Sequence, residues 1–168
     1  MSMIVLRFAH VFFGALWIGM MAFQTFFLGP TMAEMGPDGG KVMGGLMRRR
    51  LPIVMPLMGL IAIVSGLWMF QRDSGGNMGA FMATPVGKAF GWGGLSAILA
   101  FLVGVVAMRP LMMRMMKLGQ SLASAPPQDR QAQAAELQRL RSRADVLAKV
   151  VTVLMLLALA AMAVARYL

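Results

Sequence analysis

The sequence predicts an all-α, polytopic membrane protein, a bundle of four transmembrane helices, and three observations predict it. Hydrophobic residues make up 59% of the 168 residues and charged residues only 13%, whereas an average soluble domain is about 45–50% apolar and about 25% charged. Lys and Arg are concentrated in the segments that separate apolar stretches and are not spread evenly along the chain. Four stretches contain no Lys, Arg, Asp or Glu: residues 8–29, 51–70, 89–108 and 150–165.

A helix needs roughly 20 apolar residues to cross a bilayer, and three of the four stretches meet that length. The fourth is shorter, but Lys149 and Arg166 bound it, and their long side chains can extend to the interface. The first lies too near the N-terminus and runs too long for a cleaved signal peptide. We therefore predict a single transmembrane domain over residues 1–168, with spans at about 5–29, 51–71, 88–109 and 147–167.

The distribution of positive charge predicts the orientation of these spans. Four spans place both termini on one side, which then carries Arg7, Arg72, Lys88 and Arg166, whereas the other side carries the rest of the 16 Lys and Arg. The positive-inside rule puts the richer loops in the cytoplasm and both termini outside, an N-out/C-out topology. Anionic lipid headgroups then account for the net charge of +10. We expect the lipid bilayer of the inner (plasma) membrane as a partner, and no nucleic acid.

The connecting segments are predicted to be largely helical. A helix is expected over residues 41–50, and Pro56 should bend the second span. The third span should continue through residues 111–118 until Ala125-Pro126-Pro127 breaks the helix. Beyond this break, apolar residues recur at spacings of three and four at Leu137, Leu140, Ala144, Leu147, Val151 and Leu154. The fourth helix should therefore begin near residue 129, which completes a cytoplasmic helical hairpin at about 110–146, a cytoplasmic extension of helices 3 and 4.

His10 is the single histidine, and it lies about two turns into the first span. An imidazole at that depth is costly without a partner, water or a ligand. On a helix, His10, Gly14 and Trp17 share one face. Gly14 would leave a groove beside the imidazole and Trp17 would supply a flat wall, so a planar macrocycle bound by His10 could lie there. The alternative left open is a histidine bonded to a neighbouring helix or hydrated near the outer interface.

Two cations are predicted on the same side of the membrane as His10. Arg72 ends the second span and Lys88 opens the third. Such a cluster could bind the carboxylates of a porphyrin or another anion. The alternative is that both side chains only anchor helix ends at the interface.

Methionine is unusually frequent, at 20 residues. Thioethers are soft ligands for Cu(I), and they are also flexible apolar filler. The copper-binding candidates on the outer side are Met78 and Met82 with His10, joined by Met1 and Met3. Copper is therefore the alternative to a macrocycle.

The first span resembles the histidine-bearing first helix of CopD-type copper-resistance membrane proteins and HemJ-type protoporphyrinogen oxidases. The resemblance rests on Arg7-Phe8-Ala9-His10 and on residues 14–19, GALWIG. Residues 47–67, MRRRLPIVMPLMGLIAIVSGL, resemble the second helix of these proteins, and Gly87-Lys88 resembles the lysine that opens their third. The match covers roughly residues 5–105, and residues 24–30, QTFFLGP, depart from the HemJ-type exit from helix one. The resemblance implies that His10 is a haem b ligand and Lys88 an essential cation.

Two functions follow from these observations. The first is binding of haem b, or of a metal ion, through His10 near the extracytoplasmic side. A six-coordinate haem needs a second ligand, which a homodimer could supply as another His10. The alternative is a non-catalytic accessory subunit of a larger respiratory, photosynthetic or transport membrane complex. No catalytic residue is predicted, because the composition excludes a soluble enzyme and no nucleophile, base and acid can be assembled into a hydrolase.

Overall fold

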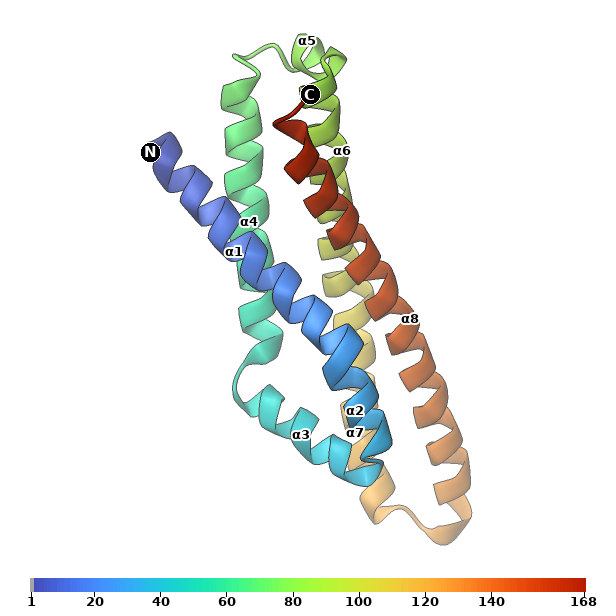
Figure 1. Ribbon diagram of the computed structural model, residues 1–168. Helices are drawn as coiled ribbons and strands as arrows, with labels where there is room; N and C mark the ends of the chain where they lie inside the picture. Colours follow the sequence, from blue (N-terminus) through green and yellow to red (C-terminus); the bar gives the residue numbers. More distant parts are fainter. Residues whose placement is uncertain (1) are drawn as a thin grey trace.

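The computed structural model describes residues 2–168, apart from the side chains of residues 37 and 123, and this part of the chain is all-α (Figure 1). Four helical segments are long and apolar enough to cross a membrane: Met3–Glu34, Leu51–Asp73, Pro85–Leu122 and Pro127–Ala165. The predicted fold class is confirmed, and the chain is a multi-pass membrane protein. Both chain ends lie at the end of the bundle that carries α5, opposite the α7–α8 turn (Figure 1).

The first span contains a wide π-helical turn. It consists of α1 (Met3–Phe23), the π turn η1 (Gln24–Leu28) and α2 (Gly29–Glu34). The Gly29 N–H bonds to the carbonyl of Gln24, five residues back. Pro30 follows directly, and proline lacks an N–H and needs room for its ring. The wider turn accommodates it, so the helix continues through a proline that usually ends one.

A short helix crosses the bundle between the first two spans. This helix, α3 (Pro37–Arg48), starts earlier in the sequence than the helix expected over residues 41–50. It also ends earlier, at Arg48 and not at residue 50. Figure 1 shows it running across the lower end of the bundle, at a steep angle to the spans. Arg50 then adopts the left-handed conformation, with φ 61°, and reverses the chain into α4 (Leu51–Asp73).

The third span, like the first, contains a π turn just before a proline. After α5 (Met78–Ala83), it comprises α6 (Pro85–Leu102), the π turn η2 (Val103–Met108) and α7 (Arg109–Ser124). The Arg109 N–H bonds to the carbonyl of Gly104, five residues back, and Pro110 follows. At the sharp turn between α5 and α6 only glycine fits at position 87, because a Cβ there would overlap the Phe81 carbonyl.

The last span is one unbroken helix, α8 (Pro127–Ala165), as the spacing of its apolar residues predicts. Its stripe is buried at Leu137, Leu140, Ala144 and Val151 and continues with Met155, Ala158 and Ala165. The part of α8 before the apolar stretch packs against α7. The helical extension expected beyond spans three and four is therefore present.

The four spans form two closely packed pairs, α1 with α4 and α6 with α8. The pairs meet at a buried cluster of Trp17, Ala100, Val151 and Met155. The hydroxyl oxygens of Thr25 and Thr152 also lie 2.8 Å apart in this region. In Figure 1, α1 leans across α4, so its N-terminal end diverges from α6 and α8. Because of this divergence, the part of α1 that carries His10 packs against α4.

Candidate functional site: the histidine of the first helix

His10 is bonded to the backbone of the second span. Its Nδ1 lies 2.7 Å from the carbonyl oxygen of Ala62 on α4, and the ring is half-buried. A carbonyl oxygen can only accept a hydrogen bond, so Nδ1 carries the proton and donates it. In a neutral imidazole this leaves Nε2 with a lone pair. The bond to a neighbouring helix, one of the two alternatives, is therefore present, and it uses only one ring nitrogen.

Gly66 makes room for the imidazole. A Cβ at position 66 would lie 2.7 Å from the His10 Cε1 and 2.8 Å from Nδ1, closer than real atoms approach. The ring therefore packs directly against the α4 backbone. The Ser65 hydroxyl lies 3.0 Å from the same Ala62 carbonyl and 2.6 Å from that of Ile61. Small residues one turn apart on α4 thus create the position that the ring occupies.

Gly14 and Trp17 share a face with His10, as predicted, and this face is turned toward α4. A Cβ on Gly14 would lie 4.0 Å from the Ala62 Cβ, an ordinary contact distance, so Gly14 faces α4. Trp17 is only 7% exposed, and its ring lies so close to Gly59 that a Cβ there would be 2.9 Å from Cε2. Helix α4 thus occupies the side where a groove was expected. A planar ligand would approach His10 at its Nε2 edge and not across Gly14 and Trp17.

The two predicted cations lie at the end of the bundle that holds the chain termini. Arg72 is in the last turn of α4 and Lys88 in the first turn of α6, and both are exposed. Helix α6 packs against α8, whereas the helix of His10 packs against α4. Among the described residues no hydrogen bond or ion pair joins Lys88 to His10. The role of these cations in binding an anion stays a prediction.

The predicted copper ligands Met78 and Met82 lie one turn apart on α5. Both side chains are exposed, and the Met82 sulfur covers Gly91 of α6, where a Cβ would lie 2.5 Å from it. Helix α5 packs on α6, while His10 and Met3 are on α1. Met1 lies outside the described residues. Within residues 2–168, no group of three or more His, Cys, Asp or Glu could hold a metal ion, so thioether coordination of copper stays a prediction.

The residues that position His10 were not predicted from the sequence. They are Ala62, Ser65 and Gly66, and together with Gly59 they are small residues on the second span. Spacings of three and four between Gly59, Ala62 and Gly66 indicate a face on which another helix can approach closely. This spacing predicts which face of the second span is in contact with another helix, but it does not predict which helix packs there.

No protein-family model, curated protein or solved structure matches this chain. The fold and the composition define the class, a multi-pass membrane protein with four helical segments long and apolar enough to span a membrane. The geometry at His10 is the feature on which a more specific function can be argued.

Proposed function

We propose that His10 is a ligand for haem b, or for a metal ion, through Nε2. The observation that carries this proposal is the 2.7 Å bond from Nδ1 to the Ala62 carbonyl. Histidines that bind metals almost always donate their other ring N–H to a carbonyl, carboxylate or water, which fixes the tautomer and strengthens the ligand. The bond to Ala62 provides this orientation with a backbone acceptor.

The donor set fits a single axial ligand. The chain has one histidine, so a haem with two histidine ligands would require His10 from a second copy. Haem b would supply one-electron redox chemistry when bound. The resemblance of span one to CopD-type and HemJ-type proteins supports the same residue. A copper ion is the alternative ligand, because neutral imidazole and thioethers both bind copper.

The charge distribution supports a position near the outer face. Arg7 lies one turn before His10, whereas Arg48, Arg49 and Arg50 lie at the opposite end of the bundle. Under the positive-inside rule, this distribution supports an extracytoplasmic position at the inner membrane for both chain ends and His10.

A second candidate function is that of a non-catalytic accessory subunit of a larger membrane complex. The observation that favours it is the small part of each span that the chain itself covers. Between 6% and 22% of the most apolar window of each span is buried. Lipid covers such surfaces, and so do the helices of partner subunits. In that case the His10–Ala62 bond would serve only to hold α1 against α4.

The test is a reduced-minus-oxidised absorbance spectrum of protein purified with haem supplied. Wild type and His10→Ala are compared with Gln24→Ala as a matched control. Gln24, in η1, also joins the first span to α4, with its Nε2 2.8 Å from the Met55 sulfur, but it carries no imidazole. We expect a haem b signal in wild type and Gln24→Ala and its loss in His10→Ala. Folded wild type without a signal would contradict haem binding, and a signal that survives in His10→Ala would contradict His10 as the ligand. Stoichiometric partners in native membranes would favour the accessory subunit.

A further inference from the structure

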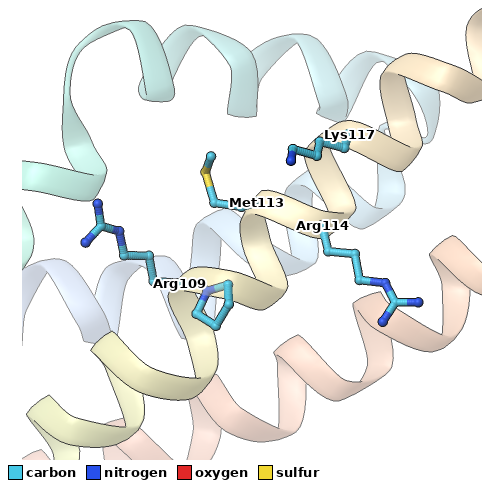
Figure 2. A pocket seen from close by; sticks show the side chains of 5 residues that line it. Arg109, Met113, Arg114 and Lys117 are labelled. Atoms are coloured by element: carbon cyan, nitrogen blue, oxygen red, sulfur yellow. The ribbon is translucent and has the colours of Figure 1, made fainter.

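A basic hollow lies beside α7, at the end of the bundle opposite His10. It is an open surface depression with a volume of about 460 Å³. Five residues of α7 line it: Arg109, Pro110, Met113, Arg114 and Lys117. Its lining thus consists of three cations and two apolar side chains, all from one helix (Figure 2).

The three cations of the hollow do not point the same way. Arg109, Met113 and Lys117 follow one another at intervals of four residues, which places them on one side of a helix. Figure 2 shows these three side chains projecting from the same side of α7, while Arg114 projects to the other side, toward α8. There the Arg114 Nη2 lies 2.6 Å from Glu136 Oε1. Arg109 and Lys117 are therefore the cations that a ligand in the hollow would meet.

Arg109 and Lys117 have no carboxylate partner in the part of the chain that the structure describes. The chain has only six acidic residues. Three of these pair with other cations, at Asp38–Lys41, Glu136–Arg114 and Asp145–Lys149. Within residues 2–168, no ion pair involves Arg109 or Lys117. Arg109 and Lys117 are about two helical turns apart, and an anion bound between them would be attracted by both charges.

The position of the hollow indicates the kind of anion. Arg109 directly follows the uncharged stretch 89–108, so it lies where the span leaves the apolar layer. Pro110 and Met113 add apolar surface, and the Met113 side chain is 44% exposed. Inorganic phosphate would contact only the cations and leave this apolar surface uncovered. A phospholipid would use both features, because its phosphate lies at the level of the interface beside the apolar part of the lipid.

We propose that this hollow binds the phosphate of an anionic phospholipid headgroup through Arg109 and Lys117, with Met113 against the glycerol and the start of the acyl chains. Arg109 can donate two parallel hydrogen bonds to phosphate oxygens, and Lys117 contributes a compact charge one turn beyond Met113. Arg114 takes no part, because Glu136 already binds it.

The test compares lipid binding by the full chain, purified in neutral detergent, using native mass spectrometry. The probes are phosphatidylglycerol and phosphatidylcholine, which carry the same acyl chains but different charge. The variants are Arg109→Gln with Lys117→Gln, and a matched control, Arg139→Gln with Arg143→Gln. The control also removes two exposed cations from one helix, α8, although they lie about one turn apart and not two. We expect wild type and control to prefer phosphatidylglycerol, and the first variant to bind it roughly thirtyfold more weakly.

Three results would overturn the proposal. They are equal binding of the two lipids by wild type, equal weakening by the control pair, and displacement of the lipid by the same concentration of inorganic phosphate. The last result would show a site for free phosphate. Circular dichroism shows whether each variant is folded. If the variant with Arg109→Gln and Lys117→Gln does not fold, Met113→Glu is tested in its place. Met113→Glu keeps both cations but places a carboxylate between them. Unchanged lipid binding by this variant would also overturn the proposal.

Discussion

The Nδ1 atom of His10 and the carbonyl oxygen of Ala62 lie 2.7 Å apart and join α1 to α4. Because the acceptor belongs to the backbone, changing the side chain at position 62 does not remove it. The contact instead depends on how closely the ring approaches the α4 backbone. Gly66 controls that approach, since it leaves the ring the space that a Cβ would fill.

We predict that Gly66→Ala displaces His10 and weakens its bond to Ala62. A Cβ at position 66 would meet two ring atoms within 2.8 Å, and such overpacking typically costs about 1–3 kcal/mol. Gly19→Ala on α1 is the matched control, because nothing lies within 4 Å of its new Cβ. That change should be neutral or stabilising, since alanine favours helix more than glycine does. Thermal unfolding in mild detergent measures both variants, and equal unfolding temperatures would contradict the close approach.

The buried hydroxyls of Thr25 and Thr152 should be energetically coupled. The Thr152 hydroxyl lies 2.8 Å from the Ala148 carbonyl and donates to it, so Thr25 must be the donor in the 2.8 Å contact between the two threonines. Interhelical hydrogen bonds in membranes average about 0.6 kcal/mol in double-mutant cycles. Thr25→Val, Thr152→Val and the double variant should therefore give a coupling of about that size. The free energy of unfolding measures it, and strictly additive losses would show that the hydroxyls do not interact.

Trp17 should report directly on the packing of α1 against α4. Its ring lies against Gly59, and Phe101 meets it edge-on at 6.1 Å between centroids. With Trp68 and Trp92 replaced by phenylalanine, Trp17 is the only tryptophan of the chain. Gly59→Ala should then shift the emission of Trp17, because its Cβ would lie 2.9 Å from the ring.

A matched control for this measurement is Gly94→Ala, whose Cβ would have no neighbour within 4 Å. An emission spectrum that responds equally to both substitutions would contradict the contact between Trp17 and Gly59.

The N-out/C-out orientation predicts which loops are accessible from outside the cell. The chain has no cysteine, so a single introduced thiol is the only one to react. Asn77→Cys lies at the end of the bundle that holds the chain termini, and Ser124→Cys at the opposite end. A membrane-impermeant maleimide should label Asn77→Cys in intact cells and Ser124→Cys only after permeabilisation. The reverse pattern would mean that the orientation inferred from the charges is wrong.

The sequence determines the helices more clearly than their arrangement. The absence of charge over four stretches predicts the spans, and the spacing from Leu137 to Val151 predicts the unbroken α8, because both signals are local. It also predicts that His10, Gly14 and Trp17 share a face. The sequence does not say which helix this face meets, because the second, third and fourth spans have similarly high mean hydropathy. The packing against α4 follows from Gly59 and Gly66, whose role depends on a partner far along the chain.

The two π turns were also not predicted. Pro30 and Pro110 indicate an interruption, and a proline after an apolar stretch usually ends a helix. Here the preceding turn widens and the helix continues. The basic hollow depends on this continuation, because Arg109, Met113 and Lys117 share a side only when α7 is helical. In the sequence, residues 112–117 are four methionines interleaved with Arg114 and Lys117, a pattern that does not show which side chains share a side.

The most direct measurement of the state of His10 is nitrogen NMR of protein labelled with ¹⁵N only in histidine. One histidine gives one pair of ring signals. We expect Nδ1 to carry the proton and Nε2 to be unprotonated, and we expect the Nε2 signal to shift or broaden when haem is added. A proton on Nε2, or an Nε2 signal that haem leaves unchanged in folded protein, would contradict the assignment of His10 as a ligand.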